Sequence, residues 1–80
     1  MITKKVPLEK QEGYLCCGEG AHGSEGFFAR LDPNERLVWV AYFEESNPFV
    51  NIKITDDHVT FETNLGVGFQ IPYVCMDSWS

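Results

Sequence analysis

Three cysteines and two histidines are the side chains here that could act as metal ligands: Cys16, Cys17, Cys75, His22 and His58. Structural zinc sites usually draw their ligands in pairs from short CxxC or HxxxH loops. Cys16 and Cys17 are adjacent instead, and adjacent residues of a strand point to opposite faces. We therefore expect the thiols to serve as small apolar groups, with no metal and no other cofactor.

A nucleophilic pair can be drawn from the same side chains, with Cys17 or Cys75 as nucleophile and His22 or His58 as base. Such a pair also needs an orienting group, an oxyanion site and a substrate cleft. A β-domain this short has little volume for a closed cleft of roughly a few hundred Å³. We predict no catalytic residue and no enzyme, and we keep a Cys/His-dependent enzyme or metal-binding domain as an alternative.

The run from Gly18 to Gly23 satisfies the pattern GxGxxG, which in dinucleotide-binding folds joins a strand to a helix. Here the continuation, Ser24-Glu25-Gly26-Phe27-Phe28, is typical of a turn and a strand. Glu19 and Glu25 would also repel phosphates. We interpret the run as a hairpin connection.

The net charge of −6, from twelve acidic and six basic residues, gives the chain a field that repels nucleic acid and anionic lipid. The same field favours a basic protein partner. No stretch approaches the roughly 18 apolar residues of a membrane span, and no apolar signal region follows the N-terminus. The odd cysteine count is unlike a secreted disulfide framework, so we expect a cytoplasmic protein.

The elements that must position these groups are short runs of aromatic and β-branched residues bounded by Gly, Pro, Asn or Asp. We predict strands near residues 13–17, 26–31, 37–44, 49–55, 58–63 and 67–72. The run 37–43 is apolar at both parities, which predicts a central strand covered on two faces, or a strand that bends between two layers. Residues 7–12 form either one helical turn or an extended arm.

The alternation over residues 50–71 predicts a three-stranded meander. A two-residue turn at Asp56-Asp57 and a three-residue loop at Asn64-Leu65-Gly66 both place apolar residues opposite one another, with Gly66 in the left-handed conformation. The predicted pairs are Ile54 with Val59, Ile52 with Phe61, Phe61 with Phe69, and Val59 with Ile71.

A hairpin is also predicted over residues 26–44, because Asp32-Pro33-Asn34-Glu35 is typical of a type I turn. Pairing Phe27, Ala29 and Leu31 with Leu37, Trp39 and Ala41 would require Glu35 to adopt a left-handed backbone, which is unfavourable. The register of this hairpin therefore stays open.

These elements predict one all-β domain over residues 1–80, mainly antiparallel, with five or six strands. A curled sheet, a small open barrel and a two-layer sandwich all fit, with or without the short N-terminal helical turn. The content of 44% hydrophobic residues suits a globular core, but so small a core is marginal alone, which leaves room for a homo-oligomer.

No run of residues resembles the diagnostic motif of a known family, so the functional hypothesis rests on charge and on the turn at residues 44–49. Two carboxylates there could pair with basic groups of a partner, beside an aromatic anchor. We hypothesise a non-enzymatic, acidic protein-binding module, of the kind of a cytosolic inhibitor or immunity-type antidote. The alternative is a small structural or homo-oligomeric protein. The predicted partner contacts are Glu44, Glu45, Phe49, Glu62 and Trp79.

Overall fold

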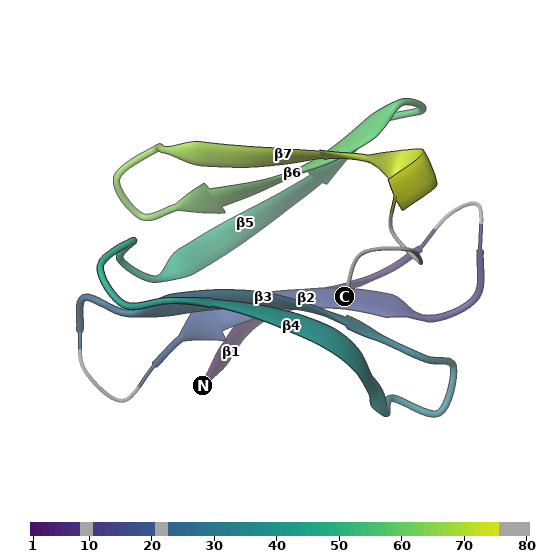
Figure 1. Cartoon of the computed structure of the whole chain (residues 1–80), viewed down its shortest axis with the longest axis horizontal. Helices are drawn as coiled ribbons and strands as arrows, with labels where there is room; N and C mark the ends of the chain where they lie inside the picture. The colour runs from purple at the N-terminus through teal and green to yellow at the C-terminus, as the bar shows by residue number, and fades with distance from the viewer. Residues whose placement is uncertain (9–10, 21–22, 76–80) are drawn as a thin grey trace.

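The computed structural model describes residues 1–8, 11–20 and 23–75, and it shows two antiparallel β-sheets packed face to face (Figure 1). This confirms the predicted all-β, antiparallel class, in the form of the two-layer sandwich. Within these residues there are seven strands and one short 3₁₀ helix: β1 Ile2–Pro7, β2 Tyr14–Glu19, β3 Gly26–Leu31, β4 Leu37–Phe43, β5 Phe49–Ile54, β6 His58–Thr63, β7 Gly68–Pro72 and η1 Tyr73–Cys75.

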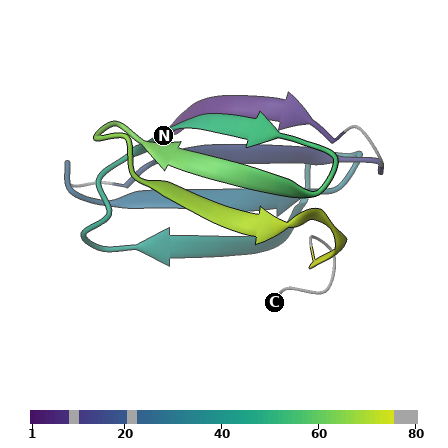
Figure 2. The same cartoon turned by 90° about the horizontal axis from the view of Figure 1, so that it is seen from above.

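Each strand pairs with its neighbours in sequence, in the orders β1-β2-β3-β4 and β5-β6-β7. The connection from β4 to β5 is the step that carries the chain from the first sheet to the second. Strand β5 packs against β1 and β2, whereas β7 lies on the side of β3 and β4 (Figure 2). The Thr3 hydroxyl donates a hydrogen bond to the backbone carbonyl of Phe49, which joins the β1 and β5 edges.

Aromatic and aliphatic side chains from both sheets fill the space between the layers. Phe28 on β3 stacks on Phe61 on β6, with ring centroids 4.0 Å apart and planes inclined by 4°. The ring of Phe49 meets Phe28 edge-on at 5.2 Å. Leu15 and Val59 are fully buried beside them, so apolar burial between two one-sided sheets holds the layers together.

The meander β5-β6-β7 has the predicted turns and registers. Ile52 lies opposite Phe61, and Phe61 lies opposite Phe69, as expected. The loop 64–66 is closed by a hydrogen bond from the Thr63 amide to the Val67 carbonyl, and Gly66 has a φ of 84°. A residue without Cβ takes this conformation without steric cost, which explains the glycine.

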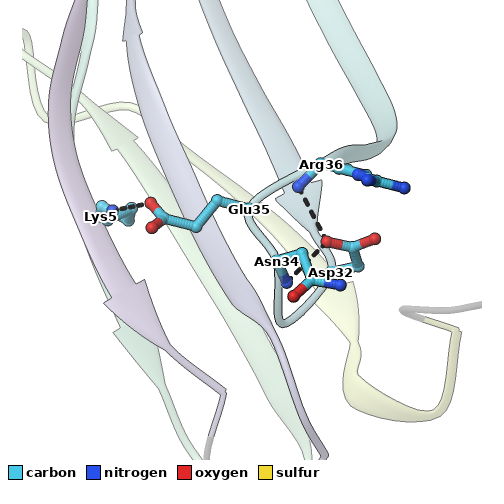
Figure 3. A network of polar contacts seen from close by, with 5 residues as sticks. All are labelled: Lys5, Asp32, Asn34, Glu35 and Arg36. Atoms are coloured by element: carbon cyan, nitrogen blue, oxygen red, sulfur yellow. Dashed lines mark hydrogen bonds and ion pairs between the residues drawn. The ribbon is translucent and has the colours of Figure 1, made fainter.

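The β3-β4 hairpin exists as predicted, and it does use the unfavourable conformation at Glu35, where φ is 64°. The Asp32 carboxylate stabilises the turn by accepting hydrogen bonds from the amides of Asn34 and Arg36 at 2.9 and 2.8 Å (Figure 3). Glu35 also forms an ion pair with Lys5 on β1. The side-chain contacts of Asp32 and Glu35 thus compensate for the strained backbone.

The register of this hairpin shifts once, between Leu31 and Arg30. Leu31 pairs with Leu37, but Arg30 pairs with Trp39, so Val38 is an extra residue on β4. The shift turns Phe28, rather than Phe27, into the core beside Trp39. The alternation in sequence could not show a bulge that reverses the inward parity between two strands.

Strand β4 is an edge strand, which corrects the prediction of a central strand covered on two faces. Trp39 is buried between the sheets, whereas Val40 and Tyr42 are 49% and 51% exposed. Both parities of this strand are apolar, but within the described residues only the inward one is covered. Trp39 thus belongs to the buried core, in which Phe28 and Phe61 stack.

Strand β1 was not predicted, because Ile2–Pro7 contains two lysines and almost every side chain of it is exposed. Backbone pairing with β2 forms it instead of apolar alternation. Of the helical turn considered for residues 7–12, Pro7 ends β1 and residues 11–13 form bends, while residues 9 and 10 lie outside the described part. Among the described residues, no helix has the length and apolarity needed to cross a bilayer.

Candidate functional site

The connection from β4 to β5 brings carboxylates and aromatic rings together at one end of the sandwich. Asn47 reverses the chain with a φ of 68°, and its amide donates to the Ser24 carbonyl at 2.9 Å. Asparagine tolerates this left-handed conformation better than most residues. Gly26 lets the loop pass, because a Cβ there would lie 2.3 Å from the Asn47 carbonyl oxygen. Local chemistry therefore fixes the backbone next to Glu44 and Glu45.

An open groove of about 500 Å³ lies beside this loop, on the side of the sandwich where β4 and β7 are the sheet edges. The Phe43 and Phe69 rings line it, with centroids 4.9 Å apart. Phe69 remains 36% exposed, although it also touches Phe28 and Phe49 of the core. The groove is thus a surface continuation of the aromatic core, lined by Tyr42, Phe43, Glu44, Glu45, Ser46 and Phe69.

The groove is rimmed by negative charge. Glu44 and Glu45 are exposed, and within the described part of the chain neither carboxylate has an ion-pair partner. A hydrogen bond with the Glu25 carboxylate raises the pKa of the Tyr42 hydroxyl, with further contributions from desolvation and from the charges of Glu25 and Glu44. Three carboxylates therefore lie close to one apolar surface, where they favour a cationic ligand.

The structure separates the five predicted contact residues. Glu44 and Glu45 lie together on the groove. Phe49 is 0% exposed and belongs to the core, so a partner could not touch it without opening the domain. Glu62 lies on the outer face of the three-stranded sheet and does not line the groove. Trp79 lies outside the described residues.

The Glu62 carboxylate is already engaged within its own sheet. It accepts a hydrogen bond from the Asn51 amide at 3.0 Å and lies 3.4 Å from the Lys53 ammonium group. The bond from Asn51, followed by the interaction with Lys53, lowers the pKa of Glu62. This residue therefore offers a partner less free charge than Glu44 or Glu45.

The thiols of Cys16 and Cys17 are both buried on β2. Cys17 is part of the core, and its sulfur lies 3.8 Å from the Thr3 hydroxyl. Burial raises the pKa of both thiols, which disfavours the thiolate needed for nucleophilic attack or metal binding. Among the described residues, no three His, Cys, Asp or Glu side chains are grouped as a metal site would require. His22 and the Cys75 side chain lie outside the description.

The glycine-rich run ends β2 and leads through the hairpin connection to β3, as we predicted. Gly18 and Glu19 belong to β2, and Glu19 pairs directly with Gly26 at the start of β3. Residues 21 and 22 of this connection are outside the described part of the chain. The strand that follows the run is not the helix on which a dinucleotide phosphate would sit.

Sequence reasoning missed Tyr42, Phe43 and Phe69 as surface residues of this site. The predicted meander register does place Phe69 opposite Phe61, but it treats Phe69 as an ordinary core residue. The partly buried Phe43 and the more exposed Phe69 meet because their edge strands, β4 and β7, lie on the same side of the sandwich although they are distant in sequence. The one sequence feature that could have indicated exposed apolar residues here is that residues 37–43 are apolar at both parities.

Comparison of this chain with protein families, with curated proteins and with solved structures finds no match.

Proposed function

We propose that this chain is a non-enzymatic protein-binding module whose acidic groove receives a basic segment of a protein partner. The observation that carries the proposal is the pair of neighbouring aromatic rings that line the groove, the partly buried Phe43 and the more exposed Phe69, beside two carboxylates without ion-pair partners among the described residues. Glu44 and Glu45 of the original contact set remain in the site. Phe69 takes the place of Phe49 as the aromatic anchor.

The chemistry of the groove fits a lysine- or arginine-bearing segment. Aromatic rings cover the aliphatic part of such a side chain, and nearby carboxylates pair with its charged end. The net charge of −6 accelerates the encounter with a basic surface and opposes binding to nucleic acid or an anionic membrane. Specificity therefore comes from charge at the rim and affinity from the rings.

We further propose that the module acts as a cytosolic inhibitor or antidote that covers a basic active site of its partner. The buried thiols of Cys16 and Cys17, with their raised pKa values, support a binding role over a Cys/His-dependent enzyme. A small homo-oligomeric protein is the second candidate, and the open edge of β4 favours it.

The test is affinity capture from extracts of the source cells, with the whole chain as bait. A Glu44→Lys/Glu45→Lys variant should lose a basic protein that the unaltered chain retains. The matched control is Asp56→Lys/Asp57→Lys, which changes the net charge equally at the turn between β5 and β6. Circular dichroism checks that both variants are folded.

Equal recovery with both variants would contradict the acidic groove as the binding site, and so would capture of nothing by the unaltered chain. The inhibitor role has its own readout. The captured protein should lose its catalytic activity when the purified chain is added, and no loss should occur with Glu44→Lys/Glu45→Lys. If the captured protein keeps its activity, inhibition is excluded, and the proposal that the chain is a binding module still stands.

A further inference from the structure

The polar side chains that line the groove all present hydrogen-bond acceptors to a ligand. Two of them are the carboxylates already described, which accept hydrogen bonds and donate none. The Ser46 hydroxyl uses its one proton in a hydrogen bond to the Asn47 carbonyl, with 2.9 Å between the oxygens. The Tyr42 hydroxyl uses its proton in the hydrogen bond to the Glu25 carboxylate. Both hydroxyl oxygens can therefore accept from a ligand, but neither has a proton left to donate.

A ligand side chain that matches these acceptors must be rich in donors. Among the described residues, no basic side chain of this chain lines the groove to supply them. Arginine has five N–H donors in one plane and no acceptor, whereas lysine has three donors on a single nitrogen. The guanidinium directs its donors outward in fixed directions, so it can reach acceptors that belong to different residues of the 42–46 segment. Donor number and geometry thus favour arginine.

The ring of Phe69 offers an apolar surface next to these acceptors. It is 36% exposed, and its centroid lies 4.9 Å from that of Phe43, 5.6 Å from that of Phe49 and 6.3 Å from that of Phe28. Contacts with the core therefore fix the ring before a ligand arrives. A planar, weakly hydrated guanidinium stacks on such a ring. A lysine ammonium group in an open groove keeps its water, and its ion pairs add little affinity.

We propose that the side chain received by this groove is an arginine of the partner, and not a lysine. Its guanidinium lies on the Phe69 ring and donates to the carboxylates of Glu44 and Glu45. The oxygens of Tyr42 and Ser46 accept from the remaining N–H groups. This inference rests on the binding function proposed above and narrows the basic segment to one residue type.

NMR titration of the isotope-labelled full chain tests the choice with three blocked glycine-rich peptides, whose central residue is arginine, lysine or citrulline. Citrulline has the shape of arginine, but it is uncharged and replaces part of the donor set with a carbonyl acceptor. The arginine peptide should bind with a dissociation constant on the order of 1 mM and shift the backbone amides of residues 42–46 and 69. The lysine peptide should bind about fivefold more weakly. The citrulline peptide should not bind.

Two variants separate the contribution of the ring from that of the charges. Phe69→Leu should weaken the arginine peptide about fivefold and leave the lysine peptide unchanged, because only the guanidinium stacks. Its control is Tyr14→Leu, which removes a partly exposed ring from β2, away from the groove lining. Glu44→Gln/Glu45→Gln should abolish binding of both cationic peptides.

The matched control for the charges is Asp56→Asn/Asp57→Asn, which removes two carboxylates at the turn between β5 and β6 and should bind arginine as before. Equal binding of the arginine and lysine peptides, both lost in the glutamine variant, would overturn the choice of arginine and leave the acidic groove as a binding site. An arginine peptide that does not bind up to about 10 mM, or that binds Phe69→Leu as tightly as the unaltered chain, would overturn the arginine site, and the affinity capture described above then decides the binding function separately. A citrulline peptide that binds as tightly as the arginine peptide would contradict both proposals, because charge would have no part in binding.

Discussion

The ring of Phe28 on β3 stacks on the ring of Phe61 on β6, with centroids 4.0 Å apart across the two sheets. Both side chains are almost completely buried. Phe28 also contacts the rings of Trp39, Phe43 and Phe49. The stacked pair is therefore the point at which the aromatic residues of the two layers meet.

Replacing Phe61 with alanine should cost about 3–5 kcal/mol of the free energy of unfolding, because a large buried ring is lost and a cavity remains. The free energy of unfolding of a typical domain is only about 5–15 kcal/mol, so this loss would be a large part of it. Urea unfolding followed by tryptophan fluorescence measures the change. Phe69→Ala is the control, since Phe69 is 36% exposed and should cost clearly less. Equal costs would show that the stacked pair has no special part in stability.

The meander could be predicted from sequence because the residues that determine its turns and strand pairing are close together in the chain. The turn residues fix the loop lengths, and a wrong loop length would have removed the apolar partner of Phe61. The role of β4 could not be predicted in this way. An apolar residue at every position fits a strand covered on both faces and equally fits an edge strand whose outward side chains are exposed. The extra residue at Val38 added a change of parity without any sequence signal.

Part of the candidate site could be predicted for the same reason. The exposure of Glu44 and Glu45 could be predicted, because acidic residues beside an Asn-Pro turn are exposed in nearly any β fold. Phe49 and Phe69 are harder to tell apart, since both are single aromatic residues near strand ends. Only the packing of the two sheets decides that Phe49 is enclosed while Phe69 lies at the open side.

Glycine at position 35 should give a more stable protein than alanine at the same position. Its φ of 64° costs an ordinary residue about 1 kcal/mol that glycine avoids. The ion pair with Lys5 is exposed and contributes between about 0 and 1 kcal/mol, so its loss must be controlled. Glu35→Ala loses the pair but keeps the strain. We expect Glu35→Gly to unfold at a higher urea concentration than Glu35→Ala, and the opposite order would show that the turn is not strained.

The carboxylate of Glu62 should titrate at a higher pH when Asn51 is replaced. The hydrogen bond from Asn51 is the largest single cause of its lowered pKa, and Lys53 adds to it through its own hydrogen bond and its charge. NMR titration of the Glu62 side-chain carbon in Asn51→Ala and in Lys53→Met measures both effects, and each substitution should raise the pKa. Because the folded-state pKa is depressed, the associated stability is present above the ordinary value of about 4.5 and is lost as the pH falls through the folded-state pKa. A Glu62 pKa that is unchanged in Asn51→Ala would contradict this hydrogen bond.

The thiols of Cys16 and Cys17 should react slowly in the folded protein and make it less stable in alkali. Desolvation raises both pKa values above the ordinary 9.0, more than the neighbouring Thr3 hydroxyl and Lys5 ammonium group lower them. In a Cys75→Ser background, the two thiols should react with an aromatic disulfide reagent at least roughly tenfold more slowly than in urea, because the reagent must wait for opening of β2.

The folded chain holds the thiol protons of Cys16 and Cys17 more tightly than the unfolded chain does. The free energy of unfolding should therefore fall as the pH rises past the ordinary thiol value of 9.0 toward the higher folded-state pKa values. Replacing Cys16 and Cys17 with alanine should make that fall shallower, measured by urea unfolding at each pH. Rapid reaction of either thiol in the folded chain at pH 7 would instead identify an accessible thiolate.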